Sequence, residues 1–339
     1  MNQVFSAEAA MACAIECARA GLGKTFPNPI VGAVITSATG EFISEGFHQG
    51  ADHAEVVAIK AAKAIPAGSI IYVTLEPCNH QGKTPPCTAA IIDAGIKKVI
   101  YAVSDPNPVA AGGGEYLRAS GVEVEHGLLE SEAAFDNRAW LTKIAKQRPR
   151  ISWKIASTMD GKVAAADGTS KWITSELARA DVALLRSQVD AIVTSTATVK
   201  ADNPLLTSKG AGQNPVRIVM GGAEIASGLQ ILNSDAETIA IKSRDLQELI
   251  TLAKARGFNQ LLIESGPTLG TALLKADLID EVILYQAPTF FGSGTPAISD
   301  LGVASISQRL DFEIADVEVI GTDLKITLVK SANLEESGR

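Results

Sequence analysis

Short apolar runs alternate with amphipathic segments along the first half of the chain, a pattern that predicts strands separated by helices. The apolar runs predict strands over residues 30–35, 42–47, 69–74, 98–103 and 122–125. Apolar positions at helical spacing predict helices over residues 6–20, 53–64, 87–94, around Tyr116 and over 131–146. Because residues 70–73 are continuously apolar, we expect the third strand to lie in the centre of a sheet. This alternation predicts a layered α/β/α sandwich.

The second half of the chain repeats the alternation and also predicts an α/β domain. Strands are predicted over residues 151–157, 189–194, 216–220, 260–263, 281–285, 312–320 and 324–329, and helices from a cap at Thr174 or Ser175 to Ser187 and over 246–256. Two strands run into turns rich in small residues, at 195–199 and 264–270. Such turns offer backbone N–H groups to phosphate, but a nucleotide site and ordinarily capped helices both remain open. The Gly-x-Gly-x-x-Gly dinucleotide fingerprint is absent.

The length of the chain predicts two domains, because its 339 residues exceed what a single core usually holds. Residues 147–150 are polar and contain a proline, which is typical of a domain boundary. We therefore expect one domain over residues 1–147 and another over 148–330. The last residues, 331–339, are polar and predict a disordered tail.

The composition, with 46% apolar and 20% charged residues, is that of a soluble globular protein. The net charge of −8 argues against a nucleic-acid partner. No apolar run reaches membrane-spanning length, and residues 1–5 lack the basic and apolar regions of a signal peptide. We expect a cytoplasmic protein with no membrane partner.

The chemistry-bearing stretch of the first half is His53-Ala54-Glu55, followed by Pro77-Cys78 and then Cys87. One histidine and two cysteines suit Zn²⁺, and three protein ligands leave the fourth position open for a water. Glu55 lies two residues from His53, as expected of a proton shuttle in a zinc deaminase. Cys87 opens a predicted helix, a position that lowers the pKa of a thiol. These residues predict a catalytic zinc site.

Two alternatives to a catalytic zinc remain. A structural zinc would need a fourth ligand, and the only nearby candidate is His80. Alternatively, the three residues are ordinary core residues with no metal. The other two cysteines, Cys13 and Cys17, are four apart in a predicted helix and are interpreted as buried thiols rather than a disulfide framework.

Asn28 stands between Pro27 and Pro29 in a stiff loop. Its side chain offers both a donor and an acceptor, the mixed pattern that a pyrimidine edge requires. An ordinary Asn-Pro turn explains the same residues equally well. A further loop, residues 105–108, follows a predicted strand at the sheet edge where ligands usually gather.

Taken together, the chain up to Lys330 resembles the bifunctional deaminase/reductase of riboflavin biosynthesis. The motifs that carry the resemblance are Pro27-Asn28-Pro29-x-Val31-Gly32, His53-Ala54-Glu55, Thr74-Leu75-Glu76-Pro77-Cys78, Ser157-x-x-Asp160-Gly161, Trp172-Ile173-Thr174, Asp202-Asn203-Pro204-x-Leu206-Thr207 and Glu264-x-Gly266-Pro267-Thr268-Leu269. The segment between Cys78 and Cys87, which contains Gly82-Lys83-Thr84-Pro85-Pro86, is more particular than the metal motif alone. The resemblance implies a cytidine-deaminase-like first domain and a dihydrofolate-reductase-like second domain.

The resemblance also implies ligands and residue roles. It implies one Zn²⁺ held by His53, Cys78 and Cys87, with Glu55 as the catalytic residue. It implies NADPH as the hydride donor and a phosphorylated pyrimidine as the substrate of both steps. The expected contacts of the deaminase substrate are Asn28, His48, His80 and Lys83; those of the reductase substrate are Ser170, Arg186, Leu206, Lys209 and Glu264; those of the cofactor are Ala156, Trp172, Thr198, Asp202, Gly266, Pro267, Thr268, Leu269, Gly270, Thr271 and Ala272.

Three departures from the family pattern affect these expectations. Lys83 and Lys209 stand where the family often has arginine, and lysine loses the bidentate fork. The segment from His48 to His53 is about two residues shorter than usual, and Gly221-Gly222 replaces an Asp followed by a small residue. A homo-oligomer, dimeric or tetrameric, is expected. The alternative function is a single zinc nucleobase deaminase whose second domain is not catalytic.

Overall fold

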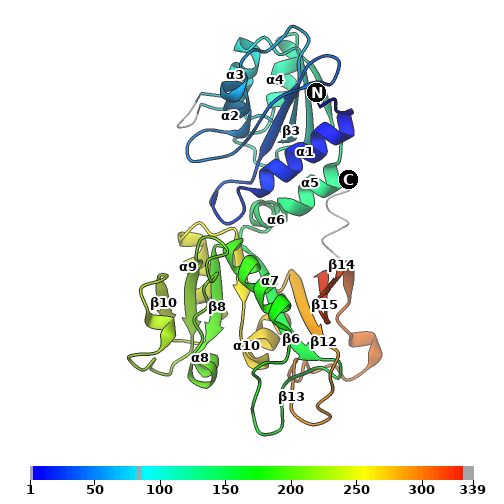
Figure 1. Cartoon of the computed structure of the whole chain (residues 1–339). Helices are drawn as coiled ribbons and strands as arrows, with labels where there is room; N and C mark the ends of the chain where they lie inside the picture. The colour runs from blue at the N-terminus through cyan, green and yellow to red at the C-terminus, as the bar shows by residue number, and fades with distance from the viewer. Residues whose placement is uncertain (1–2, 82–84, 331–339) are drawn as a thin grey trace. The chain divides into compact units, whose positions relative to one another are not determined.

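The computed structural model describes residues 3–81 and 85–330. Lys83 and the predicted tail, 331–339, lie outside the described residues. The chain divides into two compact units, one up to Gln147 and one from Arg148 onward (Figure 1). Within the described residues, no helix is both long and apolar enough to cross a bilayer.

The first unit is built on a five-stranded sheet in the order β2-β1-β3-β4-β5. Its strands are β1 (Gly32–Thr36), β2 (Phe42–Phe47), β3 (Ile70–Leu75), β4 (Lys98–Val103) and β5 (Glu123–His126). Its helices are α1 (Ala7–Arg19), α2 (Ala54–Ala61), α3 (Cys87–Asp93), α4 (Gly113–Ala119), α5 (Glu130–Asp136) and α6 (Arg138–Lys146). Strand β3 lies in the centre, as its continuous apolar run predicts. It pairs antiparallel with β1 and parallel with β4.

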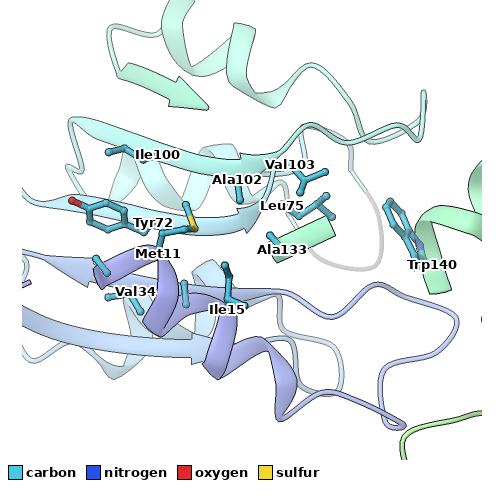
Figure 2. Packing of buried hydrophobic residues seen from close by; sticks show 12 residues of the cluster. Met11, Ile15, Val34, Tyr72, Leu75, Ile100, Ala102, Val103, Ala133 and Trp140 are labelled. Atoms are coloured by element: carbon cyan, nitrogen blue, oxygen red, sulfur yellow. The ribbon is translucent and has the colours of Figure 1, made fainter. Parts of the chain in front are cut away.

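The helices cover both faces of this sheet, which confirms the predicted three-layer sandwich. Alternate residues of β3 and β4 contact α1 and α5 on one face and α2, α3 and α4 on the other. Figure 2 shows the first of these clusters, in which Met11 of α1 lies beside Tyr72 of β3. Fully burying one such side chain contributes about 1.5–3 kcal/mol. This packing fixes the strand ends from which the site residues project.

The single helix predicted over residues 131–146 is wrong, because the chain forms two helices that meet at Asn137. The side chain of Asn137 is buried and forms hydrogen bonds with the backbone of Ile30. It accepts a hydrogen bond from the Ile30 N–H at 3.0 Å and donates one to the Ile30 carbonyl at 2.6 Å. The break therefore anchors the loop that carries Asn28.

The second unit is built on an eight-stranded sheet in the order β10-β9-β8-β11-β6-β12-β15-β14. Its strands are β6 (Arg150–Thr158), β8 (Ala191–Ser195), β9 (Val216–Met220), β10 (Thr238–Ile241), β11 (Gln260–Ile263), β12 (Glu281–Ala287), β14 (Phe312–Ile320) and β15 (Asp323–Lys330), and β7 (Lys162–Ala164) pairs with β13 (Thr295–Pro296). Its helices are α7 (Glu176–Ser187), α8 (Thr196–Asp202), α9 (Leu246–Ala255) and α10 (Pro267–Lys275), with short 3₁₀ turns η1 (Gln230–Leu232) and η2 (Ile306–Gln308).

Neighbouring strands from β10 through to β12 pair in parallel, so their carboxyl ends meet at one edge of the sheet. Register places Val193 of β8 and Trp153 of β6 on either side of Ile263 of β11. Glu264 is the first residue after β11, so it lies near the end of β8 and beside Lys154 within β6. Ser175 caps α7, as predicted, by accepting a hydrogen bond from the Ala178 N–H at 3.3 Å.

Candidate active sites

The three predicted zinc ligands come together in the first unit. His53 precedes α2, Cys78 follows the end of β3, and Cys87 is the first residue of α3. His53 Nδ1 lies 3.1 Å from Cys87 Sγ and 3.5 Å from Cys78 Sγ. Ligand atoms around a tetrahedral zinc are separated by roughly 3.5 Å, given Zn–S and Zn–N bonds of about 2.3 and 2.1 Å. The donor types and their separations therefore fit Zn²⁺.

Among the described residues, the atoms that could hold a metal belong to His53, Cys78 and Cys87, all within 4.8 Å of one another. His80, the fourth ligand that a structural zinc would need, is not in this group. A set of three protein ligands is typical of a catalytic zinc, which keeps one position open. The geometry thus favours the catalytic interpretation over the structural one.

The pKa values of the two thiols shift in opposite directions. Hydrogen bonds from Cys87 and His53 stabilise the Cys78 thiolate and hold its pKa at about 4, although burial opposes this. The Cys78 thiolate and burial raise the pKa of Cys87 instead. The Cys78 thiolate thus opposes a second negative charge on Cys87, although Cys87 stands at the start of a helix.

Glu55 lies in the first turn of α2 and is buried. Burial raises the pKa of its carboxyl group to about 7. A carboxyl group with a pKa near neutrality can both accept and donate a proton at physiological pH. Glu55 lies beside the metal ligands but is not one of them, as expected of a proton shuttle.

Of the predicted substrate contacts, His48 lies against the metal ligand His53, and Asn28 lies against His48. The rings of His48 and His53 pack edge to face with centroids 5.4 Å apart, and His48 Nε2 lies 3.2 Å from Asn28 Nδ2. His48 is buried, and burial lowers its pKa, so a neutral ring is favoured. His80 is half-buried, and its Nδ1 has no hydrogen-bond partner among the residues that the structure describes.

A cluster of charged residues lies at the carboxyl edge of the second sheet. Arg186 donates to Glu264 through Nε at 2.6 Å and through a terminal nitrogen at 2.9 Å. Lys154 of β6 completes the cluster with its Nζ 3.1 Å from Glu264. Burial would raise the pKa of Glu264, but Arg186 and Lys154 overcome this and lower it to about 2. Glu264 is therefore ionised at neutral pH.

The two small-residue turns meet beside this cluster. Ser195 caps α8 by accepting a hydrogen bond from the Thr198 N–H at 3.2 Å, so the first turn is an ordinarily capped helix. The Thr198 hydroxyl accepts a hydrogen bond from the Gly266 N–H at 3.2 Å. The turns that follow β8 and β11 are thereby joined into one surface.

Comparison with known proteins accounts for both units. The model of the cytidine and deoxycytidylate deaminase zinc-binding region matches residues 5–103, and the model of the RibD C-terminal domain matches residues 149–326. The riboflavin biosynthesis protein RibD of Mycobacterium tuberculosis is 42% identical over 337 residues, which cover 97% of this chain and 99% of that protein. The chain belongs to the RibD family.

Other RibD proteins agree in sequence and in structure. The Escherichia coli protein is 37% identical, with 94% of this chain and 98% of the relative covered. The crystal structure of a diaminohydroxyphosphoribosylaminopyrimidine deaminase/5-amino-6-(5-phosphoribosylamino)uracil reductase from Thermotoga maritima has a TM-score of 0.88 and 34% identity, and covers 95% of this chain and 98% of its own. A RibD structure from Acinetobacter baumannii has a TM-score of 0.87 and 36% identity, with 95% and 98% covered.

Membership of the RibD family confirms the resemblance and the fold class predicted from the sequence. The chain is a bifunctional enzyme of riboflavin biosynthesis, with a hydrolytic deaminase and an oxidoreductase activity. The deaminase domain is of a zinc-binding type, and the reductase domain implies a nicotinamide cofactor. The alternative of a non-catalytic second domain is not supported, because the reductase model spans that unit.

The other residues predicted for the RibD reductase site fall into two groups. Trp172 is largely exposed, and the Arg179 guanidinium carbon lies 4.7 Å from the centroid of its ring. Lys171 Nζ donates a hydrogen bond to the Asp202 carbonyl at 2.7 Å. Ser170, Ala156, Pro267, Leu269 and Gly266 are half-buried, and Thr268, Ala272 and Lys209 are exposed. In contrast, Gly270 and Thr271 face the interior. A Cβ at Gly270 would lie 2.1 Å from the Trp153 ring, so only glycine fits there.

Two charged residues near the sites, the half-buried Lys154 and the buried Glu76, were not predicted from the sequence. Lys154 is the one charged residue of the predicted strand 151–157, and this isolated charge was the available signal. Glu76 is buried directly before Pro77 and Cys78. Its carboxylate accepts hydrogen bonds from the N–H groups of Asp105 at 3.1 Å and Gly114 at 2.8 Å. Glu76 thus ties β3 to the loop that begins at Asp105.

This loop forms one wall of the metal site. Ala110 packs against Cys78 and Cys87, and its carbonyl accepts a hydrogen bond from the Asn79 N–H at 3.5 Å. A Cβ at Gly113 would lie 1.7 Å from the Pro77 carbonyl oxygen, so the close approach of the loop requires glycine. Displacing the loop would therefore move a surface that contacts two metal ligands.

Replacing Glu76 by glutamine should lower the deaminase kcat/KM about tenfold, because one buried N–H then faces an NH₂ group at a cost of about 1–3 kcal/mol. Zinc content and reductase activity should stay unchanged, and both should be measured in the same preparation. Glu16→Gln is a suitable control, since that side chain is 73% exposed. Unchanged deamination by folded Glu76→Gln protein would contradict the positioning role.

Proposed function

We propose that the first unit deaminates 2,5-diamino-6-(5-phosphoribosylamino)pyrimidin-4(3H)-one and that the second unit reduces the ribosyl group of the product to ribityl with NADPH. The observation that carries this proposal is the presence, in one chain, of the His53–Cys78–Cys87 cluster and the Arg186–Glu264–Lys154 cluster. The structural relative from Thermotoga maritima, whose name states both activities, supports the choice of substrate.

In the deaminase unit we assign His53, Cys78 and Cys87 as the metal ligands and Glu55 as the proton carrier. Zinc, when bound there, supplies Lewis-acid activation of a water at neutral pH. Glu55 accepts the proton that this water loses and delivers it to the departing amino group, which leaves as ammonia. The burial of its carboxyl group, which raises its pKa to about 7, supports both roles.

We assign recognition of the pyrimidine to Asn28, His48 and His80, and contact with its phosphate to Lys83, which lies outside the described residues. The hydrogen-bonding distance between Asn28 and His48 supports a joint role for these two side chains. Asn28 Nδ2 and a neutral His48 ring orient each other, so that the amide plane is fixed before the substrate binds. Such preorganisation lowers the entropy lost on binding.

In the reductase unit the chemistry requires a hydride at C1′ and a proton on O4′, with cleavage of the C1′–O4′ bond. NADPH supplies the hydride. Glu264 is ionised and cannot supply the proton, so we assign this role to Lys154, whose Nζ lies 3.1 Å from Glu264. Arg186 holds Glu264 in place. Ser170, Lys209 and the backbone of Leu206, whose side chain is buried in the core, are assigned to the remaining surface of the substrate.

We assign the cofactor to the joined turns after β8 and β11, where Thr198 and Gly266 meet. The further residues of this proposed surface are Ala156, Trp172, Asp202, Pro267, Thr268, Leu269 and Ala272, whereas Gly270 and Thr271, also predicted as cofactor contacts, face the interior. The choice of NADPH over NADH is part of the proposal. Cytoplasmic location and assembly into a homo-oligomer also stay predictions.

Removing zinc with a chelator should abolish ammonia release and leave NADPH-dependent reduction of the deaminated substrate unchanged. The reason is that the metal ligands all lie in the first unit, whereas the predicted reductase residues all lie in the second. Both activities should be measured on one sample, and added Zn²⁺ should restore the first. Loss of hydride transfer in metal-free protein that is still folded would contradict separate sites.

A further inference from the structure

Arg217 of β9 is fully buried in the second unit, where a guanidinium group is costly to place. Its described side-chain hydrogen bonds all go to carbonyl oxygens, at Leu205, Asn233 and Ala236. Burial lowers its pKa, although Asp235 nearby opposes this. A buried cation that joins three separate chain positions is suited to holding their geometry.

One of these positions borders a residue in an unfavourable backbone conformation. Leu206 has φ of 51°, in the left-handed region that side chains with a Cβ rarely adopt. Leu206 is buried, and its side chain belongs to the core cluster that contains Val219 of β9 and Ile231 of η1. The local sequence offers no glycine at this position, so surrounding contacts must maintain the conformation.

The buried Arg217 and the half-buried Arg186 hold the peptide carbonyls on either side of Leu206. Arg217 donates to the Leu205 carbonyl at 3.2 Å, and Arg186 donates to the Thr207 carbonyl at 3.2 Å. Arg186 is also the residue that binds Glu264 through two nitrogens. The conformation of Leu206 is thereby connected to the charged cluster at the sheet edge.

Further hydrogen bonds tie the same loop to residues 230–236. The Asn203 side chain accepts a hydrogen bond from the Gln230 N–H at 2.8 Å. Asn214 accepts from the Ser208 N–H at 2.9 Å and donates to the Asp235 carbonyl at 3.0 Å. Arg217 also joins these two segments, because it donates to Leu205 of the loop and to Asn233 and Ala236.

We propose that Arg217 is a positioning residue of the reductase, which holds Leu206 in its left-handed conformation and so presents the loop 203–209 to the substrate. The proposal rests on the proposed function, in which Leu206 and Lys209 contact the reductase substrate. Arg217 does not itself touch substrate or cofactor; it acts through the Leu205 carbonyl.

The first test is Arg217→Lys, which keeps the charge but cannot reach three carbonyl oxygens with one compact ammonium. Release of Leu206 lowers the fraction of loop ready to bind, so the KM for the deaminated substrate should rise about tenfold. Deaminase activity should stay unchanged. Arg217→Gln, which keeps N–H donors without the charge, should raise KM similarly.

The second test uses glycine at position 206, because glycine adopts positive φ without steric cost. In a Leu206→Gly background, Arg217→Lys should change KM by less than about twofold, since no unfavourable conformation remains to be held. A merely structural arginine would raise KM equally in both backgrounds. This comparison separates positioning from general stability.

Leu249→Val is the control, because Leu249 is a buried residue of α9 outside the loop. It should lower thermal stability and leave KM unchanged. An unchanged KM in folded Arg217→Lys protein overturns the proposal, as does a failure of both Arg217 variants to fold. If the wild-type protein does not reduce the deaminated substrate at all, the proposed function itself fails, which is a distinguishable outcome.

Discussion

Glu55→Gln protein is expected to release ammonia at least about a thousandfold more slowly than the wild type, because the side chain keeps its size but can no longer carry a proton. Zinc content should be preserved, since Glu55 is not among the atoms that form the metal-ligand group. The same protein should reduce the deaminated substrate at the normal rate. Ammonia release, zinc content and NADPH oxidation on one preparation provide the measurement.

The preserved reductase activity serves as an internal control for this variant, because it reports that the chain has folded and is present in the stated amount. Near-normal ammonia release by Glu55→Gln would remove Glu55 from the chemistry. Joint loss of both activities in zinc-loaded, folded protein would argue against two separate sites.

Glu264→Gln should lower the reductase kcat/KM by about a hundredfold or more and leave deamination unchanged. The neutral side chain leaves Arg186 and Lys154 without their shared buried anion, and breaking such a pair costs about 3–5 kcal/mol. Both cations then shift away from the position that the substrate requires. Steady-state NADPH oxidation with the deaminated substrate provides the measurement.

The chain offers a closely matched control at the opposite end of the same sheet. Glu281 is fully buried and accepts hydrogen bonds from Arg150 at 3.3 Å and from the Ser152 hydroxyl at 2.6 Å. Glu281→Gln should lower thermal stability comparably while reductase kcat/KM per folded molecule stays within about twofold. Equal kinetic losses in the two variants would mean that Glu264 matters only for stability.

The metal-ligand set could be predicted from the sequence because its chemistry is visible in residue types and short spacings. His53 and Glu55 are two residues apart, and Cys78 directly follows a recognisable apolar strand. The position of each ligand at a strand or helix end follows from the same apolar pattern. The layered architecture was predictable for the same reason, since strand and helix periods differ.

Contacts between distant segments could not be predicted in this way. The helix break at Asn137 is accompanied by hydrogen bonds to Ile30, which is 107 residues away. The Glu76 carboxylate accepts a hydrogen bond from the Gly114 N–H, which is 38 residues away. The ion pair of Lys154 with Glu264 depends on the strand order, which places β6 beside β11. Residues 131–146 have a helical pattern of apolar positions, and Asn137 alone does not interrupt it. Nothing in the neighbouring sequence indicates that the Asn137 amide hydrogen-bonds to the backbone of Ile30.

The most direct test of two consecutive reactions in one chain is to follow ammonia and NADPH together after adding the diamino substrate to the wild-type protein. We expect one NADPH to be oxidised for each ammonia released, with NADPH oxidation lagging behind. Glu55→Gln protein should show neither signal with this substrate but should oxidise NADPH when given the deaminated one. Ammonia release by the wild type without any NADPH oxidation would contradict the account.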